Sequence, residues 1–151
     1  MENFNSIEEI LNYAIGEEQA AVDFYTSLAA NAHSEDMKTA FTEFANEEIN
    51  HKTRLTKIKT EGIFSLPSGK VTDLKIGDYL VNVKPHENMT YQEALILAMK
   101  KEKAAFVLYS KLAERAPNQA LKEVFHLLAI EESRHKLRFE IEYDDYVLKE
   151  N

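Results

Sequence analysis

Apolar and polar positions alternate along most of this chain with the period of an α-helix. From Met37 to Ile58, steps of three and four residues connect a series of apolar side chains that only Glu48 and His51 interrupt. Residues at this spacing share one face of a helix, and such a face packs against neighbouring helices. The pattern predicts a helix whose buried face carries a carboxylate and an imidazole one turn apart.

Four segments of this kind have recognisable ends. They are predicted as helices over residues 7–32, 34–61, 91–116 and 118–148. Ser6 with Glu9, and Thr90 with Glu93, have the capping-box spacing that begins a helix, while Gly62 is a natural stop. Only short connections separate the first helix from the second and the third from the fourth. Each pair is therefore expected to form an antiparallel hairpin.

The connection between the two pairs, residues 62–90, is long for a compact domain. Its apolar residues predict that it packs against the helices rather than forming a loose linker; they are Val71, Leu74, Ile76, Tyr79, Leu80, Val81 and Val83. One long crossover is the connectivity of ferritin-like bundles. The sequence therefore predicts an all-α, ferritin-like four-helix bundle that forms a single domain over residues 1–151.

The two hairpins have related sequences. Residues 7–54 align with residues 91–138 without a gap, and 18 of these 48 positions are identical. The agreement indicates a duplicated helical hairpin, so a residue on the inner face of one copy should face its equivalent in the other.

Composition excludes several classes of function. A net charge of −8 disfavours nucleic acid and anionic membranes as partners, because both require basic patches. The absence of cysteine excludes disulfides, thiolate metal sites and thiol catalysis. The N-terminus, MENFNSIEEI, is unlike a secretory signal, and no apolar run reaches the roughly 20 residues of a membrane span. A cytoplasmic protein is expected.

Each predicted helix has one glutamate within its apolar face, and two helices add a histidine three residues later. The resulting set is Glu18, Glu48, His51, Glu102, Glu132 and His135. Four buried carboxylates require compensating charge, which two divalent cations would supply. These ligand types suit iron or manganese, and the choice between the two stays open. The alternative is a buried polar network that only fixes the register of the helices.

In the expected arrangement, Glu18 and His51 bind one metal, and Glu102 and His135 bind the other. Glu48 and Glu132 bridge the two ions. A glutamate from each of two helices plus Glu-x-x-His from each of the others is the ligand pattern of ferritin-like dinuclear sites.

The chain resembles the rubrerythrin branch of the ferritin-like superfamily. The residues that carry the resemblance are EQAAVDFY (18–25), EKAAFVLY (102–109), EINH (48–51) and ESRH (132–135). The resemblance implies two non-haem irons, a role in reducing peroxide or O₂ in oxidative-stress defence, and a homodimer. Metal binding or storage without significant redox turnover is the alternative function. A structural bundle that needs no metal is a third possibility.

Two departures from rubrerythrins matter. Those proteins usually carry a cysteine-rich rubredoxin module that delivers electrons, whereas this chain has no cysteine, so a separate electron donor is expected. Rubrerythrins also have a further glutamate on the third helix, three residues after the ligand, and Ala105 occupies that position here. A symmetric site of six ligands is therefore expected.

Tyr25 and Tyr109 follow the first and third glutamates by two turns. They could hydrogen-bond the ligand carboxylates, or simply fill the core, and both interpretations stay open. The remaining candidate ligands are expected to face solvent; they are Glu17, Glu47, Glu131, His33, His86 and His126.

Overall fold

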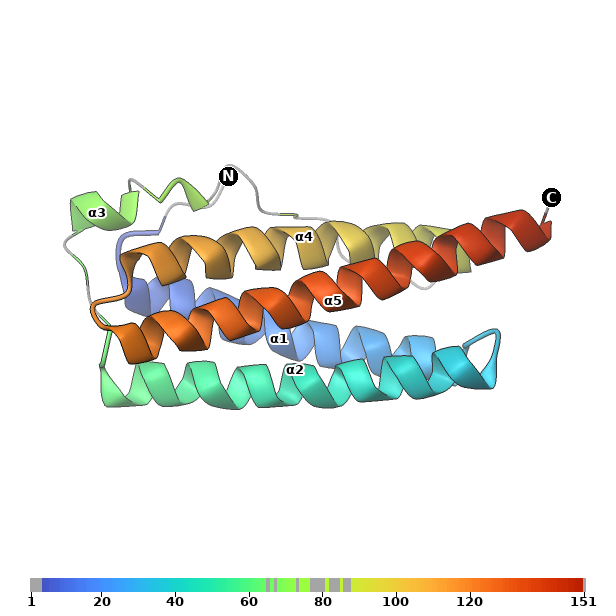
Figure 1. Cartoon of the computed structure of the whole chain (residues 1–151), viewed down its shortest axis with the longest axis horizontal. Coiled ribbons are helices and arrows are strands. Elements are labelled where there is room, and N and C mark those ends of the chain that lie inside the picture. The colour runs from blue at the N-terminus through green and yellow to red at the C-terminus, as the bar shows by residue number, and fades with distance from the viewer. Residues whose placement is uncertain are drawn as a thin grey trace. The chain divides into compact units, whose positions relative to one another are not determined.

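The computed structural model describes residues 4–64, 66, 68–72, 74–76, 81, 85 and 88–150. Helices dominate this part of the chain, and no strand occurs among the described residues. The all-α class predicted from the sequence is therefore confirmed. The helices are α1 (Ile7–Ala30), α2 (Glu35–Glu61), α3 (Ser68–Thr72), α4 (Tyr91–Arg115) and α5 (Gln119–Glu150) (Figure 1).

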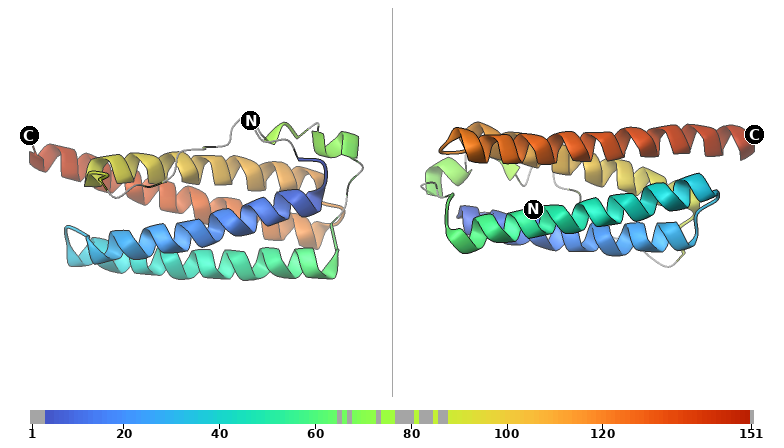
Figure 2. Two further views of the ribbon diagram at one scale, coloured as in Figure 1. Left: turned by 180° about the vertical axis from the view of Figure 1, so that it is seen from behind. Right: turned by 60° about the horizontal axis from the view of Figure 1, so that its bottom comes forward.

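Helices α1 and α2 form the first hairpin (Figure 2). The capping box at Ser6 and Glu9 is present, since the Ser6 hydroxyl accepts from the Glu9 amide and the Glu9 carboxylate accepts from the Ser6 amide. Ser34 caps α2 in the same way, by accepting from the amide of Met37. Helix α2 ends at Gly62, whose φ of 62° lies in the left-handed region that favours glycine. The predicted start and stop signals are confirmed.

Helices α4 and α5 form the second hairpin. The predicted capping box of Thr90 and Glu93 begins α4, and Asn118 caps α5 by accepting from the amide of Leu121 at 2.9 Å. Near the open end of the hairpin, the Tyr91 hydroxyl donates to Glu142 at 2.8 Å. Burial and this hydrogen bond raise the pKa of Tyr91, so the phenol stays protonated and keeps α4 tied to α5.

Each hairpin buries the apolar face that the sequence predicted. In α1 and α2 this face includes Leu11, Ala14, Tyr25, Leu28, Met37, Phe41, Leu55 and Ile58. In α4 and α5 it includes Leu95, Ala98, Tyr109, Leu112, Leu121, Phe125, Leu128 and Phe139. Because these residues recur every three or four positions, they lie along one side of each helix, and that side carries the candidate ligands.

The crossover contains the short helix α3, which the sequence did not predict. Val71, Leu74 and Ile76 are buried, as predicted for the apolar residues of this segment, and Val81 is half-buried. Lys101 of α4 donates to the Val81 carbonyl at 2.8 Å, so this part of the crossover is attached to α4. Tyr79, Leu80 and Val83 lie outside the described residues.

The chain divides into two compact units, one with α1 to α3 and the other with α4 and α5. The boundary lies between Leu74 and Lys75. Each unit thus contains one copy of the duplicated hairpin. That the two units together make a single domain stays a prediction. None of the helices in the described part of the chain has the length and apolar character needed to cross a membrane.

Candidate metal centre

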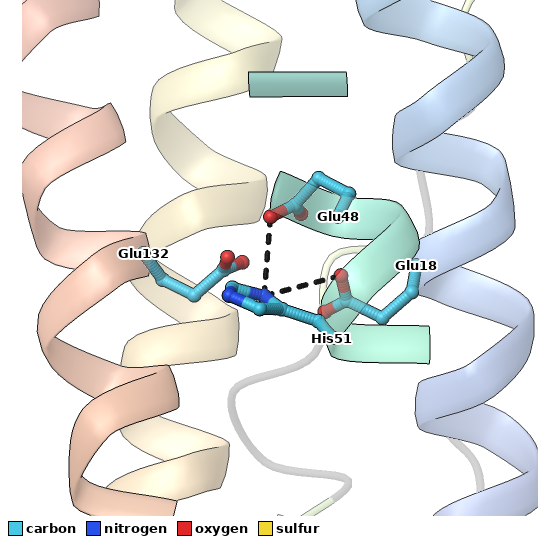
Figure 3. A group of neighbouring side chains, drawn as sticks. All are labelled: Glu18, Glu48, His51 and Glu132. Carbon is cyan, nitrogen blue, oxygen red and sulfur yellow. Dashed lines mark ion pairs between the residues drawn. The ribbon is translucent and has the colours of Figure 1, made fainter. Parts of the chain in front are cut away.

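Three side chains of the first hairpin come together at the imidazole of His51. Its Nδ1 atom lies 3.4 Å from Oε2 of Glu18 on α1 and 3.2 Å from Oε1 of Glu48 on α2 (Figure 3). Glu48 and His51 are one turn apart on α2, whereas Glu18 reaches them from the neighbouring helix. We call these three residues the first triad.

The second hairpin repeats this arrangement with the equivalent residues. Nδ1 of His135 lies 3.7 Å from Oε2 of Glu102 on α4 and 3.8 Å from Oε1 of Glu132 on α5. These three residues are the second triad. The two triads come from positions that align in the internal repeat, so the same local sequence produces the same local geometry twice.

Both triads are buried. None of the six side chains is more than 3% exposed, and both histidines are fully buried. The buried charged residues in the described part of the chain include no lysine or arginine. With a neutral imidazole, each triad therefore holds two carboxylates whose negative charge no buried basic side chain balances. Such a group is costly to bury unless cations or protons neutralise it.

The donor atoms of each triad fit a divalent cation. The three ligand atoms within a triad all lie within 4.8 Å of one another, close enough for a single ion to contact them. Two carboxylates and one neutral imidazole balance the charge of one divalent cation, and this donor set suits iron or manganese better than a soft metal. Every residue in these clusters was among the ligands predicted from the sequence, and no further ligand joins them in the part of the chain searched.

Tyr25 and Tyr109 are both almost completely buried beside aromatic partners. The Tyr25 ring lies 6.4 Å from Phe44 in an edge-on arrangement, and the Tyr109 ring is stacked 6.4 Å from Phe125. Each ring therefore packs between the two helices of its own hairpin. This packing accounts for the apolar part of each tyrosine, while a role for its hydroxyl beside the ligands remains a proposal.

The other candidate ligands lie elsewhere. His33 and His126 are both exposed, as predicted, while His86 lies outside the described residues. Glu17, Glu47 and Glu131 are half-buried, not fully exposed as expected. Each of the three directly precedes a triad glutamate. Successive residues on a helix differ by about 100° in direction. These three side chains therefore lie at the border of the buried face, where they are only partly covered.

Comparison with known proteins gives one match that spans both hairpins. A family model described as Rubrerythrin matches residues 9–79 and 93–151. The matched ranges contain all six triad residues. Neither the curated proteins nor the solved structures yielded a match.

Proposed function

The chain belongs to the rubrerythrin family, and on this premise we propose that it is a dinuclear metal carboxylate protein of the di-iron type. Its activity is the oxidation of Fe(II) coupled to reduction of peroxide or O₂. The observation that carries the proposal is the pair of buried triads, each with two carboxylates and an imidazole around one point. Such a paired set of ligands is what a ferritin-like dinuclear site requires.

In the proposed site, each triad would hold one ion. Glu18 and His51 would hold the first ion, Glu102 and His135 would hold the second, and Glu48 and Glu132 would serve both. The internal repeat supports this pairing, because related hairpins that pack through equivalent faces bring equivalent residues together. Four carboxylates would then balance two divalent cations.

When bound, the two ions would supply electrons and open coordination positions for the oxidant. The protein's own contribution is to hold the ligands in a buried environment. Buried apolar residues on the same helix faces as the triads, including Phe41, Leu55 and Phe125, would keep water away from the site. Because carboxylates bind in several modes, the bridging glutamates can adjust as the charge of the site changes.

Electrons must reach the site from outside these 151 residues. The chain has no cysteine and therefore cannot carry the thiolate-ligated iron centre that rubrerythrins usually contain. Ala105 also lacks the carboxylate that rubrerythrins place at this position, and its half-buried methyl group offers no ligand atom. We propose a separate electron donor and a symmetric set of six ligands. A cytoplasmic location is part of the same proposal.

Elemental analysis of protein purified without chelators or a metal-affinity tag tests this function. We expect close to two iron ions per chain, followed by oxidation of the loaded Fe(II) protein by peroxide or O₂ in stopped-flow absorbance. A result of two manganese ions per chain would support the dinuclear site but would identify manganese, not iron, as its metal. Many ions per chain would instead indicate storage. Protein that takes up no Fe(II) under anaerobic conditions would show that the triads serve only the architecture.

A further inference from the structure

The two hairpins carry equivalent candidate ligands but different net charges. Of the chain's net charge of −8, the unit that contains α1 to α3 (residues 2–74) accounts for −7, and the rest of the chain accounts for −1. Each unit contains two of the four triad glutamates, so these ligands do not cause the difference. The difference lies in the residues around them.

Much of the difference occurs directly beside the triads. Within two positions of a ligand, the first hairpin has one cation and two anions, which are Lys52, Glu17 and Glu47. The equivalent positions of the second hairpin have five cations and one anion; they are Lys100, Lys101, Lys103, Arg134, Lys136 and Glu131. The residues that flank the first triad therefore carry a net charge of −1, and those that flank the second triad carry +4.

The clearest contrast is between Glu17 and Lys101, which occupy the same position of the internal repeat. Each directly precedes the ligand on its helix, and each is half-buried. Lys101 donates to the Val81 carbonyl of the crossover at 2.8 Å, which holds its ammonium group beside α4. Water and salt screen half-buried charges less than exposed ones. Glu17 therefore attracts an ion at the first triad, whereas Lys101 repels an ion at the second.

Ion pairing reduces the contrast without removing it. Lys136 pairs with Glu140 one turn further along α5. With Glu140 included, the residues beside the second triad still carry a net charge of +3. Lys52, the repeat equivalent of Lys136, instead donates to the neutral side chain of Gln19 at 2.8 Å. A divalent cation at the second triad thus meets net repulsion from the flanking residues, and one at the first triad meets net attraction.

The triads also differ in how closely their donor atoms approach each other. Two donor atoms that each lie about 2.1 Å from one ion are about 3.0–3.4 Å apart in octahedral or tetrahedral geometry. The distances of 3.4 and 3.2 Å from His51 to its two carboxylates fall in this range (Figure 3). The corresponding distances from His135 are 3.7 and 3.8 Å, so the second triad has to contract around an ion. The first triad is therefore the better organised for binding.

We propose that the two triads bind their ions with unequal affinity and in a fixed order. The first triad fills first and holds its ion more tightly, through Glu18, Glu48 and His51, and the second triad fills at a higher metal concentration. A form with one ion per chain is then a stable stage of loading. The ion of the second triad is the one that exchanges with the solution. This inference rests on the proposed dinuclear site and adds that the flanking residues make two equivalent sets of ligands unequal.

Anaerobic titration of the metal-free, full-length protein with Fe(II), monitored by isothermal titration calorimetry, tests the order of loading. We expect two ions to bind in two steps whose dissociation constants differ by about tenfold or more. Glu17→Lys should raise the dissociation constant of the tight step by about threefold or more, because it reverses a charge beside the first triad. Lys101→Glu should lower the dissociation constant of the weak step by a similar factor. Circular dichroism verifies that the variants keep their helices.

Matched controls separate a charge beside a triad from the net charge of the chain. Glu61→Lys and Lys122→Glu make the same charge changes at exposed positions of α2 and α5. Each lies ten residues from the nearest triad residue of its helix, which is about 15 Å and beyond the Debye length at physiological salt. Both should leave the two dissociation constants within about twofold of the wild type. Lys101→Met removes the hydrogen bond to Val81 without adding negative charge, so it should have a smaller effect than Lys101→Glu.

The possible results distinguish this inference from the proposed function. Two ions that bind in one step with a single dissociation constant would overturn the inference and leave the dinuclear site intact. An effect of Glu17→Lys on the weak step would overturn the order of loading. If Lys101→Met acted as strongly as Lys101→Glu, charge would not be the cause of the difference. Protein that binds no Fe(II) would instead refute the dinuclear site, and the inference with it.

Discussion

Six buried polar residues, four glutamates and two histidines, could be identified from the sequence because each interrupts an otherwise apolar series. A carboxylate such as Glu48 between Phe44 and Leu55 has no reason to occur in a buried face unless something neutralises it. The half-burial of Glu47 and Glu131 could not be foreseen in the same way. Periodicity assigns a residue to a face of a helix, whereas the extent to which a neighbouring helix covers the edge of that face depends on packing.

Single substitutions separate the proposed ligands from their neighbours. Glu48→Ala or Glu132→Ala removes a proposed bridge, so metal content should fall from about two ions per chain to one or fewer. Glu17→Ala should leave it unchanged, because Glu17 lies outside the triad although it is adjacent to Glu18. Elemental analysis after dialysis against trace chelator makes the measurement.

The variants also distinguish loss of a ligand from loss of the fold. In the metal-free protein, Glu48→Ala should unfold no more easily than the wild type, because it removes one of two neighbouring buried carboxylates. If Glu17→Ala lost metal, the ligand on α1 would be Glu17 and not Glu18. If Glu48→Ala kept its metal, Glu48 would not be a ligand.

The ends of the long helices were predictable because side chains close to each end satisfy specific backbone groups. Ser6, Thr90 and Gly62 act through hydrogen bonds or backbone conformation that depend on local sequence alone. Helix α3 was missed because five residues are too few to produce a periodic pattern.

Two glycines of the first hairpin should respond in opposite directions to alanine. Gly16 lies within α1 on an exposed face, and an added Cβ would meet nothing within 4 Å, so Gly16→Ala should stabilise the protein by about 0.5–1 kcal/mol. Gly62 also has open space around it, but its φ of 62° is unfavourable for alanine, so Gly62→Ala should destabilise by about 1 kcal/mol. Urea unfolding followed by circular dichroism measures both. Equal effects of the two substitutions would contradict this assignment of the end of α2.

At the scale of the whole molecule, the metal would couple two units that the chain forms separately. Each hairpin has its own apolar face, caps and triad. The sequence predicts from the repeat that the two inner faces pack together, but the relative position of two folded units depends on many weak contacts that periodicity does not describe. Ligands from both hairpins around one pair of ions would join the units more specifically than apolar contacts alone, because coordination fixes direction as well as distance.

Removal of metal should therefore lower the stability of the entire chain. A ligand present at a thousand times its dissociation constant stabilises the folded state by about 4 kcal/mol, which for a chain of this size corresponds to a rise in melting temperature of roughly 10 °C. Scanning calorimetry of the iron-loaded and chelator-treated protein makes the comparison. The double variant Glu48→Ala, Glu132→Ala is the control, and it should melt at the same temperature with and without chelator. If the wild type also melts at one temperature under both conditions, although elemental analysis shows that the chelator removed its metal, the ions do not link the two hairpins. The buried triads would then be tolerated by the fold without contributing to its stability through metal binding.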